Sequence, residues 1–120
     1  MDKNLKLLQA IVKGLDDKKG IDIKVLKVDD LTVLTDYFVI CNGSSTTQVK
    51  ALADNAEVES EKLGERVLHR EGYDNGEWIL LDYGVIIVHV FKPESRSFYK
   101  MENVWADGKE MNIEEIISAK

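Results

Sequence analysis

The strongest structural signal in this chain is WILLDYGVIIVHVF, residues 78–91. Residues that favour β-strands fill both halves of this stretch, and the tripeptide Asp82-Tyr83-Gly84 between them is typical of a turn. The stretch therefore predicts a β-hairpin. Trp, Asp, Tyr, His and Phe occur along it, and a sheet surface that displays these residue types is suited to docking a partner.

The predicted hairpin has two different faces, because side chains alternate between the two sides of a strand. Trp78, Leu80 and Asp82 share one side of the first strand, and His89 shares a side of the second with Phe91. The positions between them are aliphatic and suit packing against helices. In that case Trp78, Leu80, His89 and Phe91 form an open or semi-open apolar patch, which is typical of a protein interface. The alternative is that the aromatic residues and His89 belong to the core.

The rest of the chain predicts helices and further strands around this hairpin. Apolar residues recur at helical spacing in two segments, and Ser45 with Gln48 forms a capping-box pattern at the start of the second. Asn75-Gly76 is a two-residue hairpin signal that completes a three-strand antiparallel meander. The expected helices span about residues 3–18 and 46–63, with short ones at 95–101 and after Asn112, and the expected additional strands span 21–28, 37–41 and 67–71. The predicted fold class is α/β (α+β), with about five strands flanked by helices.

Length and composition indicate one domain, residues 1–120, in the cytoplasm. A chain of 120 residues is long enough for one core and too short for two. No apolar run approaches the ~20 residues of a membrane span, the start lacks an export signal, and the single cysteine suits a reducing compartment. With 22 acidic and 16 basic side chains the net charge is −6, which disfavours direct binding of nucleic acid and favours a basic protein partner.

No residue pattern predicts a metal site or a catalytic nucleophile. His69 and His89 lack the spacing of zinc ligands. Cys41 lies in a strongly apolar segment and is expected to be a small buried hydrophobe. Ser44 and Ser45 are expected to cap a helix, since no Gly-x-Ser-x-Gly motif surrounds them. We therefore expect no cofactor and no metal.

The segment Gly43-Ser44-Ser45 has one further interpretation, because a glycine and serines between a strand and a helix can bind a phosphate through backbone N–H groups. Nucleotidyltransferases use such a turn together with two carboxylates one residue apart, which hold magnesium ions. The chain lacks that pair after the turn, and Asp82 is a single acid. An enzyme is therefore not expected, although nucleotidyl transfer stays an alternative function.

Several motifs of the chain occur together in one known family. They are Asp36-Tyr37-Phe38-Val39-Ile40 with Gly43 and Ser45, Gln48-Val49-Lys50-Ala51, the hairpin 78–91, and Arg96-Ser97-Phe98-Tyr99 with Glu102 and Trp105. By these motifs, which extend over about residues 21–107, the chain resembles the bacterial ribosomal silencing factors, also called Iojap-like proteins.

This resemblance implies a translational repressor that binds ribosomal protein fourteen on the intersubunit face of the large ribosomal subunit. It would block association with the small subunit under nutrient limitation. The resemblance also implies homodimers and a mixed sheet related to the nucleotidyltransferase fold, without its catalytic carboxylates. The docking surface that it implies comprises Trp78, Leu80, Asp82, Tyr83 and His89, with Phe91 and Tyr99 as neighbours. A general dimeric adaptor is the remaining alternative.

One position departs from the family pattern at the tip of the hairpin. Val85 follows the Asp-Tyr-Gly turn where the family commonly has Asp, which removes one acid near the expected docking surface. The expected mechanism is steric, because a 13.6 kDa domain on the intersubunit face occupies volume that the small subunit needs. Such inhibition requires neither covalent chemistry nor a nucleotide.

Overall fold

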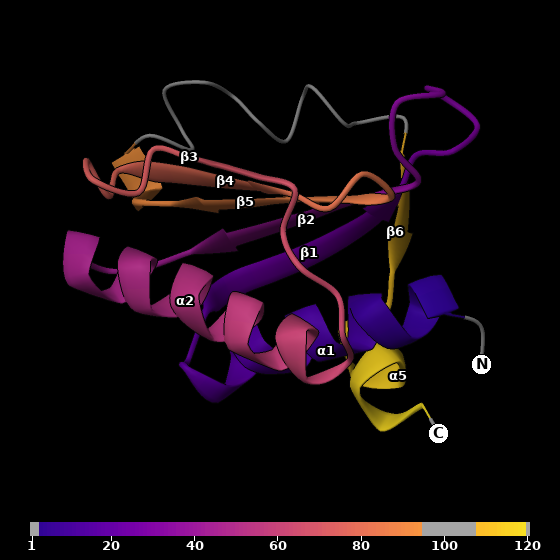
Figure 1. Cartoon of the computed structure of the whole chain (residues 1–120), viewed down its shortest axis with the longest axis horizontal. Coiled ribbons are helices and arrows are strands. Elements are labelled where there is room, and N and C mark those ends of the chain that lie inside the picture. The colour runs from indigo at the N-terminus through magenta and orange to yellow at the C-terminus, as the bar shows by residue number, and fades with distance from the viewer. Residues whose placement is uncertain (1–2, 95–107, 120) are drawn as a thin grey trace.

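A mixed β-sheet with helices against one side forms the body of the protein (Figure 1). The computed structural model describes residues 3–94 and 108–119. In chain order the elements are α1 (Lys3–Asp17), β1 (Ile21–Lys27), β2 (Tyr37–Asn42), α2 (Thr46–Lys62), β3 (His69–Glu71), β4 (Trp78–Asp82), β5 (Ile86–Phe91), β6 (Lys109–Met111) and α5 (Ile113–Ser118). Across the sheet the six strands follow the order β3-β4-β5-β2-β1-β6. The predicted fold class is confirmed.

The sheet has one more strand than the sequence predicts. β2 and β5 pair in parallel and the other neighbouring pairs are antiparallel, so the sheet is mixed, and β3, β4 and β5 form the expected meander. β6 escapes prediction because Lys109-Glu110-Met111 shows no alternation of apolar residues, and it lies at the edge beside β1. The short helix expected at 95–101 lies outside the described residues.

The loop between β3 and β4 differs from the two-residue turn expected at Asn75-Gly76. Pairing ends at Glu71 and Leu80, so residues 72–77 form a wider loop, and that expectation is wrong. The register is still the one that a turn centred on Asn75-Gly76 imposes. Within the wider loop, the N–H of Gly76 donates to the Gly72 carbonyl oxygen at 3.0 Å. This hydrogen bond makes the turn inside the loop.

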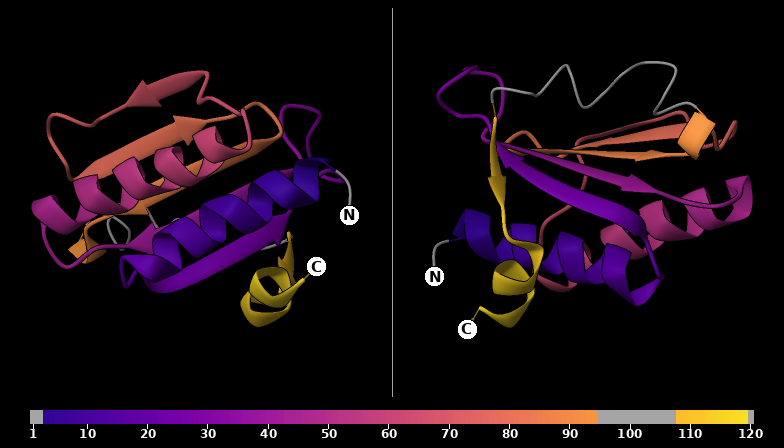
Figure 2. Two further views of the ribbon diagram at one scale, coloured as in Figure 1. Left: turned by 60° about the horizontal axis from the view of Figure 1, so that its bottom comes forward. Right: turned by 180° about the vertical axis from the view of Figure 1, so that it is seen from behind.

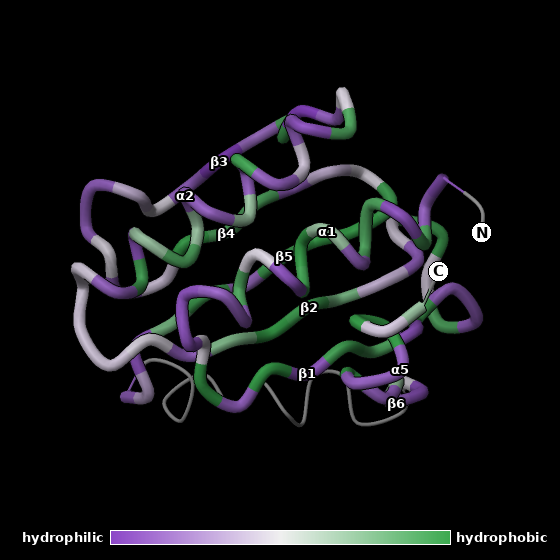
Figure 3. Tube along the Cα trace, turned by 90° about the horizontal axis from the view of Figure 1, so that it is seen from below, coloured by the Kyte–Doolittle hydropathy of each residue, from purple (hydrophilic) through white to green (hydrophobic). Residues whose placement is uncertain are grey.

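The main hydrophobic core lies between the sheet and the helices α1 and α2, which run side by side on one face (Figure 2). The aliphatic side chains of the hairpin point into it, and Ile79, Leu81, Ile86, Val88 and Val90 are fully buried. The predicted packing of these aliphatic faces on helices is confirmed. Burial stabilises the fold by roughly 1.5–3 kcal/mol for each such side chain. The central strands β2 and β5 are accordingly largely hydrophobic in Figure 3.

α1 and α2 approach each other closely at Gly14. A Cβ atom at this position would lie 2.9 Å from the backbone oxygen of Asn55 and 3.2 Å from the Cα atom of Ala56, so only glycine fits. The side-chain amide of Asn55 also donates to the Gly14 carbonyl oxygen at 2.7 Å. This contact fixes the two helices as one layer beneath the sheet.

The C-terminal helix α5 is attached to α1. Asn112 caps it as predicted, because its side-chain oxygen accepts the backbone N–H of Glu115 at 3.0 Å. The side-chain amide of Gln9 in α1 donates to the carbonyl oxygens of Ile116 and Ile117 at 3.1 and 3.2 Å. None of the helices within the described residues is long and apolar enough to cross a membrane.

Candidate functional site

The face of the sheet that points away from α1 and α2, here called the second face, brings together five of the predicted site residues. Residues that pair across neighbouring strands point to the same side of a sheet. Strand pairing therefore places three rows of side chains on the second face, each crossing β4, β5 and β2: Trp78–Phe91–Asn42, Leu80–His89–Ile40 and Asp82–Ile87–Phe38.

An aromatic cluster holds the middle of the second face together. The indole N–H of Trp78 donates to Nδ1 of His89 at 3.1 Å. The ring centroids of Trp78 and Phe91 lie 5.2 Å apart. The His89 ring stacks on the Phe91 ring with an interplanar angle of 7°. The ring of His89 also contacts the ring of Phe38 in β2, with 5.9 Å between the ring centroids. Because Nδ1 accepts a hydrogen bond, the imidazole is neutral and carries its proton on Nε2.

Two of the four residues of the expected open patch are buried. Phe91 is 0 % exposed and His89 is 4 % exposed, so the expectation that they lie open is wrong for both. The parallel β2–β5 pairing places Phe38 of β2 next to His89, and Phe38 and Ile40 belong to the same buried cluster as Phe91. Trp78 and Leu80 are half-buried and form, with Asp82, the accessible part of the predicted site.

His89 is expected to make the protein less stable as the pH falls. Burial lowers the pKa of His89 from 6.5 to about 4, because the charged form loses its hydration. The unfolded chain therefore takes up this proton near pH 6.5, whereas the folded protein resists it down to about pH 4, and the stability is full only above pH 6.5. Between pH 7.5 and pH 5 the free energy of unfolding should fall by about 2 kcal/mol, which urea titration measures.

Two variants isolate the contribution of His89 to that pH dependence. The His89→Leu variant should lack it, whereas His69→Leu, at an exposed position of β3, should keep it. Equal pH dependence of His89→Leu and the unmodified chain would contradict the assignment.

Tyr83 lies on the helix side of the sheet and not on the second face. It is 7 % exposed, and its hydroxyl lies 2.8 Å from Oγ of the buried Ser60 in α2, which itself donates to the Glu57 carbonyl oxygen. Burial raises the pKa of Tyr83 to about 12. Of the other predicted site residues, Tyr99 lies outside the part of the chain that the structure describes.

The variant Tyr83→Phe should therefore be less stable than the unmodified chain but bind its partner equally well. Removal of the hydroxyl takes one buried hydrogen bond from Ser60, so we expect the free energy of unfolding to fall by about 1 kcal/mol in urea titration. Co-sedimentation with large ribosomal subunits, which the family resemblance suggests as the binding assay, should be unchanged. Weaker sedimentation at unchanged stability would instead assign Tyr83 to the docking surface.

The tip of the hairpin is a tight turn, and it directs the Val85 side chain toward the helix side of the sheet. Gly84 has a φ of +82°, and its N–H donates to the side-chain oxygen of Asp82 at 2.7 Å. The N–H of Val85 donates to the Tyr83 carbonyl oxygen at 3.1 Å, which closes the turn. The Val85 side chain packs against the main core on the helix side. The departure from the family pattern therefore lies away from the second face.

The turn between β2 and α2 makes its hydrogen bonds within the protein. The N–H of Gly43 donates to the carbonyl oxygen of Phe91 at 2.8 Å, and the N–H of Ser44 donates to the side-chain oxygen of Gln48. Ser45 caps α2 by accepting the N–H of Gln48 at 3.1 Å, which confirms the predicted capping role. The N–H groups of Gly43 and Ser44, which the phosphate interpretation needs, therefore already bond within the chain.

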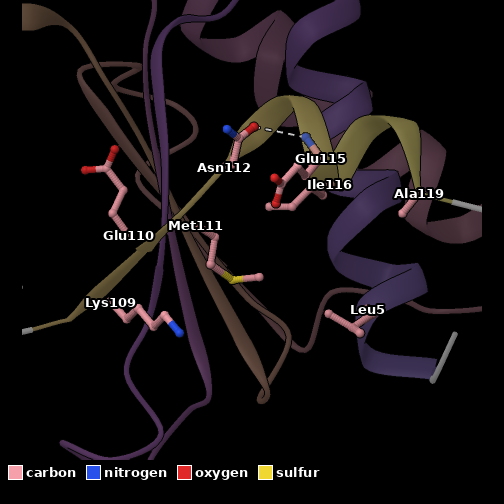
Figure 4. A pocket seen from close by; sticks show the side chains of 8 residues that line it. All are labelled: Leu5, Lys109, Glu110, Met111, Asn112, Glu115, Ile116 and Ala119. Carbon is pink, nitrogen blue, oxygen red and sulfur yellow. Dashed lines mark hydrogen bonds between the residues drawn. The ribbon is translucent and has the colours of Figure 1, made fainter.

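Two further features of the described residues bear on metal and small-molecule binding. Among residues 3–94 and 108–119, His, Cys, Asp and Glu side chains form no group of three that suits a metal ion. A hollow of about 480 Å³ lies between α1, β6 and α5 (Figure 4). Its lining includes Leu5, Met111 and Ile116, and the Asn112 side chain at its border is occupied by the helix cap.

Two parts of the second face were missing from the predicted site. Ile87 lies beside Asp82 and is half-buried, and alternation along its strand already places it on the side of His89. The loop between β1 and β2 borders the same end of the face, and it carries Leu31, Val33 and Leu34 exposed. Apolar residues in a connection between strands are the sequence signal that would have found it.

The comparisons with known proteins agree with one another. The family model described as "Ribosomal silencing factor during starvation" matches residues 1–120. A "Ribosomal silencing factor RsfS" of Halalkalibacterium halodurans is 35 % identical over 115 residues, which are 96 % of this chain and 98 % of the relative. "Mitochondrial assembly of ribosomal large subunit protein 1" of Mus musculus is 30 % identical over 101 residues, 82 % of this chain and 44 % of the relative. A crystal structure of a protein from Chromobacterium violaceum aligns with a TM-score of 0.84 at 35 % identity, over 88 % of each chain. The chain therefore belongs to the ribosomal silencing factor family.

Proposed function

We propose that this protein docks on the large ribosomal subunit through the second face and thereby keeps the small subunit from joining. Translation in the cytoplasm would then fall under nutrient limitation. Family membership supports a role at the ribosome, and the name of the mouse relative points to the large subunit. The proposed contact on that subunit is ribosomal protein fourteen, as the family resemblance implies.

The observation that carries this proposal is the arrangement of Trp78, Leu80 and Asp82 along β4. Trp78 and Leu80 are half-buried, so each has apolar area left to bury against a partner. Trp78 is held by its hydrogen bond to His89 and by the Phe91 ring, so its orientation is fixed before docking. A fixed aromatic side chain loses little entropy on binding, and tryptophan is enriched among the residues that dominate binding energy.

Charge supports a basic protein as the partner. The net charge of −6 attracts a cationic surface over distances of about 10 Å at moderate salt, and Asp82 places one acid beside the apolar residues of β4. In this proposal His89 and Phe91 are buried and hold the Trp78 side chain in place. Docking on the intersubunit face would act by excluded volume alone.

Replacing Asp82 with asparagine tests the proposed charge contact. Asparagine keeps an oxygen that can accept the Gly84 N–H, so the turn survives while the charge is removed. Sedimentation with purified large subunits should show about fivefold weaker binding at low salt and a smaller difference at high salt. The matched control is Glu61→Gln, at an exposed position of α2, which should bind like the unmodified chain.

Two outcomes of that experiment would contradict the proposal. If the unmodified chain fails to sediment with large subunits, the docking function is wrong. If it forms dimers through Trp78 and still fails to sediment with subunits, the adaptor alternative gains the support instead.

A further inference from the structure

The loop between β1 and β2 exposes apolar side chains in an unusual concentration. Seven large hydrophobic residues within the described ranges are exposed, and three of them lie in this loop: Leu31 at 53 %, Val33 at 102 % and Leu34 at 81 %. These side chains would stabilise the fold if they were buried, and in their exposed positions they do not. Patches of this kind mark interaction sites more often than isolated exposed residues do.

Hydrogen bonds hold the loop in a defined shape. The N–H of Val28 donates to the Asp36 carbonyl oxygen at 2.8 Å across the base of the loop. Within the loop the N–H of Leu31 donates to the Val28 carbonyl oxygen, and the N–H of Leu34 donates to the Thr32 hydroxyl at 3.1 Å. The apolar side chains therefore project from a loop whose backbone is pinned at several points.

The loop continues the second face of the sheet. Leu31 and Leu34 line a hollow of about 310 Å³ whose other walls include Phe38 and Ile87 of the second face. Ile87 is the direct pairing partner of Asp82, so the hollow borders the accessible end of the proposed docking site. Ile87 of β5 thus links the accessible residues of β4 to this loop.

The charges around the loop select the kind of partner that fits. Asp30 is exposed beside the apolar side chains, whereas Asp29 and Asp36 line a separate hollow together with Lys3 and Lys27. Lys27 lies 3.8 Å from Asp29, so Asp30, and Asp82 next to Ile87, carry the negative charge closest to the loop hollow. This charge, with the net charge of −6, repels the phosphates of RNA. It also disfavours a symmetric pair of two copies through this loop, since a two-fold axis would bring like charges together.

We infer that residues 31–34 form a second anchor of the docking site, which takes an apolar side chain of a basic protein surface. This inference rests on the proposed function and extends it from the hairpin to the loop. The partner would place an aliphatic or aromatic side chain in the hollow and a lysine or arginine beside Asp30. Two anchors on separate elements would fix the orientation of the protein on the subunit.

A double variant of the loop and a matched double variant in α2 and its C-cap residue test this inference. Leu31→Ser with Leu34→Ser should weaken sedimentation with purified large subunits at least tenfold. Val58→Ser with Leu63→Ser removes two side chains of comparable exposure, 48 % and 49 %, on the helix side, and should leave binding unchanged. Val33→Ser, at a fully exposed position that no core contact needs, should weaken binding about threefold even where the double variant folds poorly.

The outcomes separate this inference from the proposed function. Unchanged binding of both loop variants, together with loss of binding in Trp78→Ala, would overturn the second anchor and leave docking through β4 standing. Absence of binding by the unmodified chain would overturn both. If sedimentation velocity shows that the loop variants lose a dimer while subunit binding persists, the loop takes a second copy of the chain, and the inference is wrong.

Discussion

Replacement of Trp78 with alanine should weaken binding to large ribosomal subunits at least 30-fold. Truncation of a dominant interface residue costs about 2 kcal/mol or more of binding free energy, which corresponds to that factor. The same change removes the hydrogen bond to His89 and the contact with the Phe91 ring. We therefore also expect the free energy of unfolding to fall by about 2 kcal/mol, since a half-buried tryptophan loses less than a fully buried one.

Two controls separate docking from folding in this experiment. Trp78→Phe keeps a ring against Phe91 but cannot donate to His89, and it should retain most of the binding. Tyr73→Ala removes an aromatic side chain on the helix side, where its hydroxyl donates to Asp54, and should leave binding unchanged. The docking assignment is wrong if folded Trp78→Ala sediments with subunits as the unmodified chain does.

Replacement of Phe91 with alanine should cost about 4 kcal/mol of stability. Phe91 is fully buried and contacts Trp78 and His89, so its removal leaves a cavity among side chains of the second face. A domain of this size is stable by roughly 5–15 kcal/mol, so the variant should fold with little margin. Urea titration measures the loss, and Phe91→Leu, which keeps most of the volume, should cost far less.

The Phe91 variants also test whether this residue acts in docking itself. At low temperature and low urea, where the Phe91→Ala variant is folded, its affinity for large subunits should fall less than that of Trp78→Ala, because Phe91 orients Trp78 but is itself fully buried. A stability loss below 1 kcal/mol with a large loss of affinity would show that Phe91 contacts the partner directly.

Local patterns in the sequence predict most of the elements and the two faces of the hairpin. The helical spacing of apolar residues gives α1 and α2 nearly to the residue, and Ser45 and Asn112 act as the predicted caps. Alternation along β4 and β5 correctly separates Ile79 and Leu81 from Trp78 and Leu80. These features depend on neighbours within a few positions, which is why a sequence alone can indicate them.

The features that the sequence does not indicate arise where residues far apart in the chain meet. His89 lies next to Phe38 because β2 pairs with β5, and the sequence of the hairpin gives no indication of that contact. Tyr83 follows the end of β4, so strand alternation does not govern it, and its partner Ser60 comes from α2. β6 is recognised through its pairing with β1 and not through its composition. Each of these placements is set by tertiary contact.

Light scattering from a mixture of purified small and large subunits tests the central claim most directly. With the unmodified chain in excess, we expect the signal of assembled ribosomes to fall as the protein concentration rises. The folded Trp78→Ala variant at the same concentrations should leave the signal nearly unchanged. Full assembly in the presence of excess unmodified protein would contradict the proposal that this chain keeps the two subunits apart.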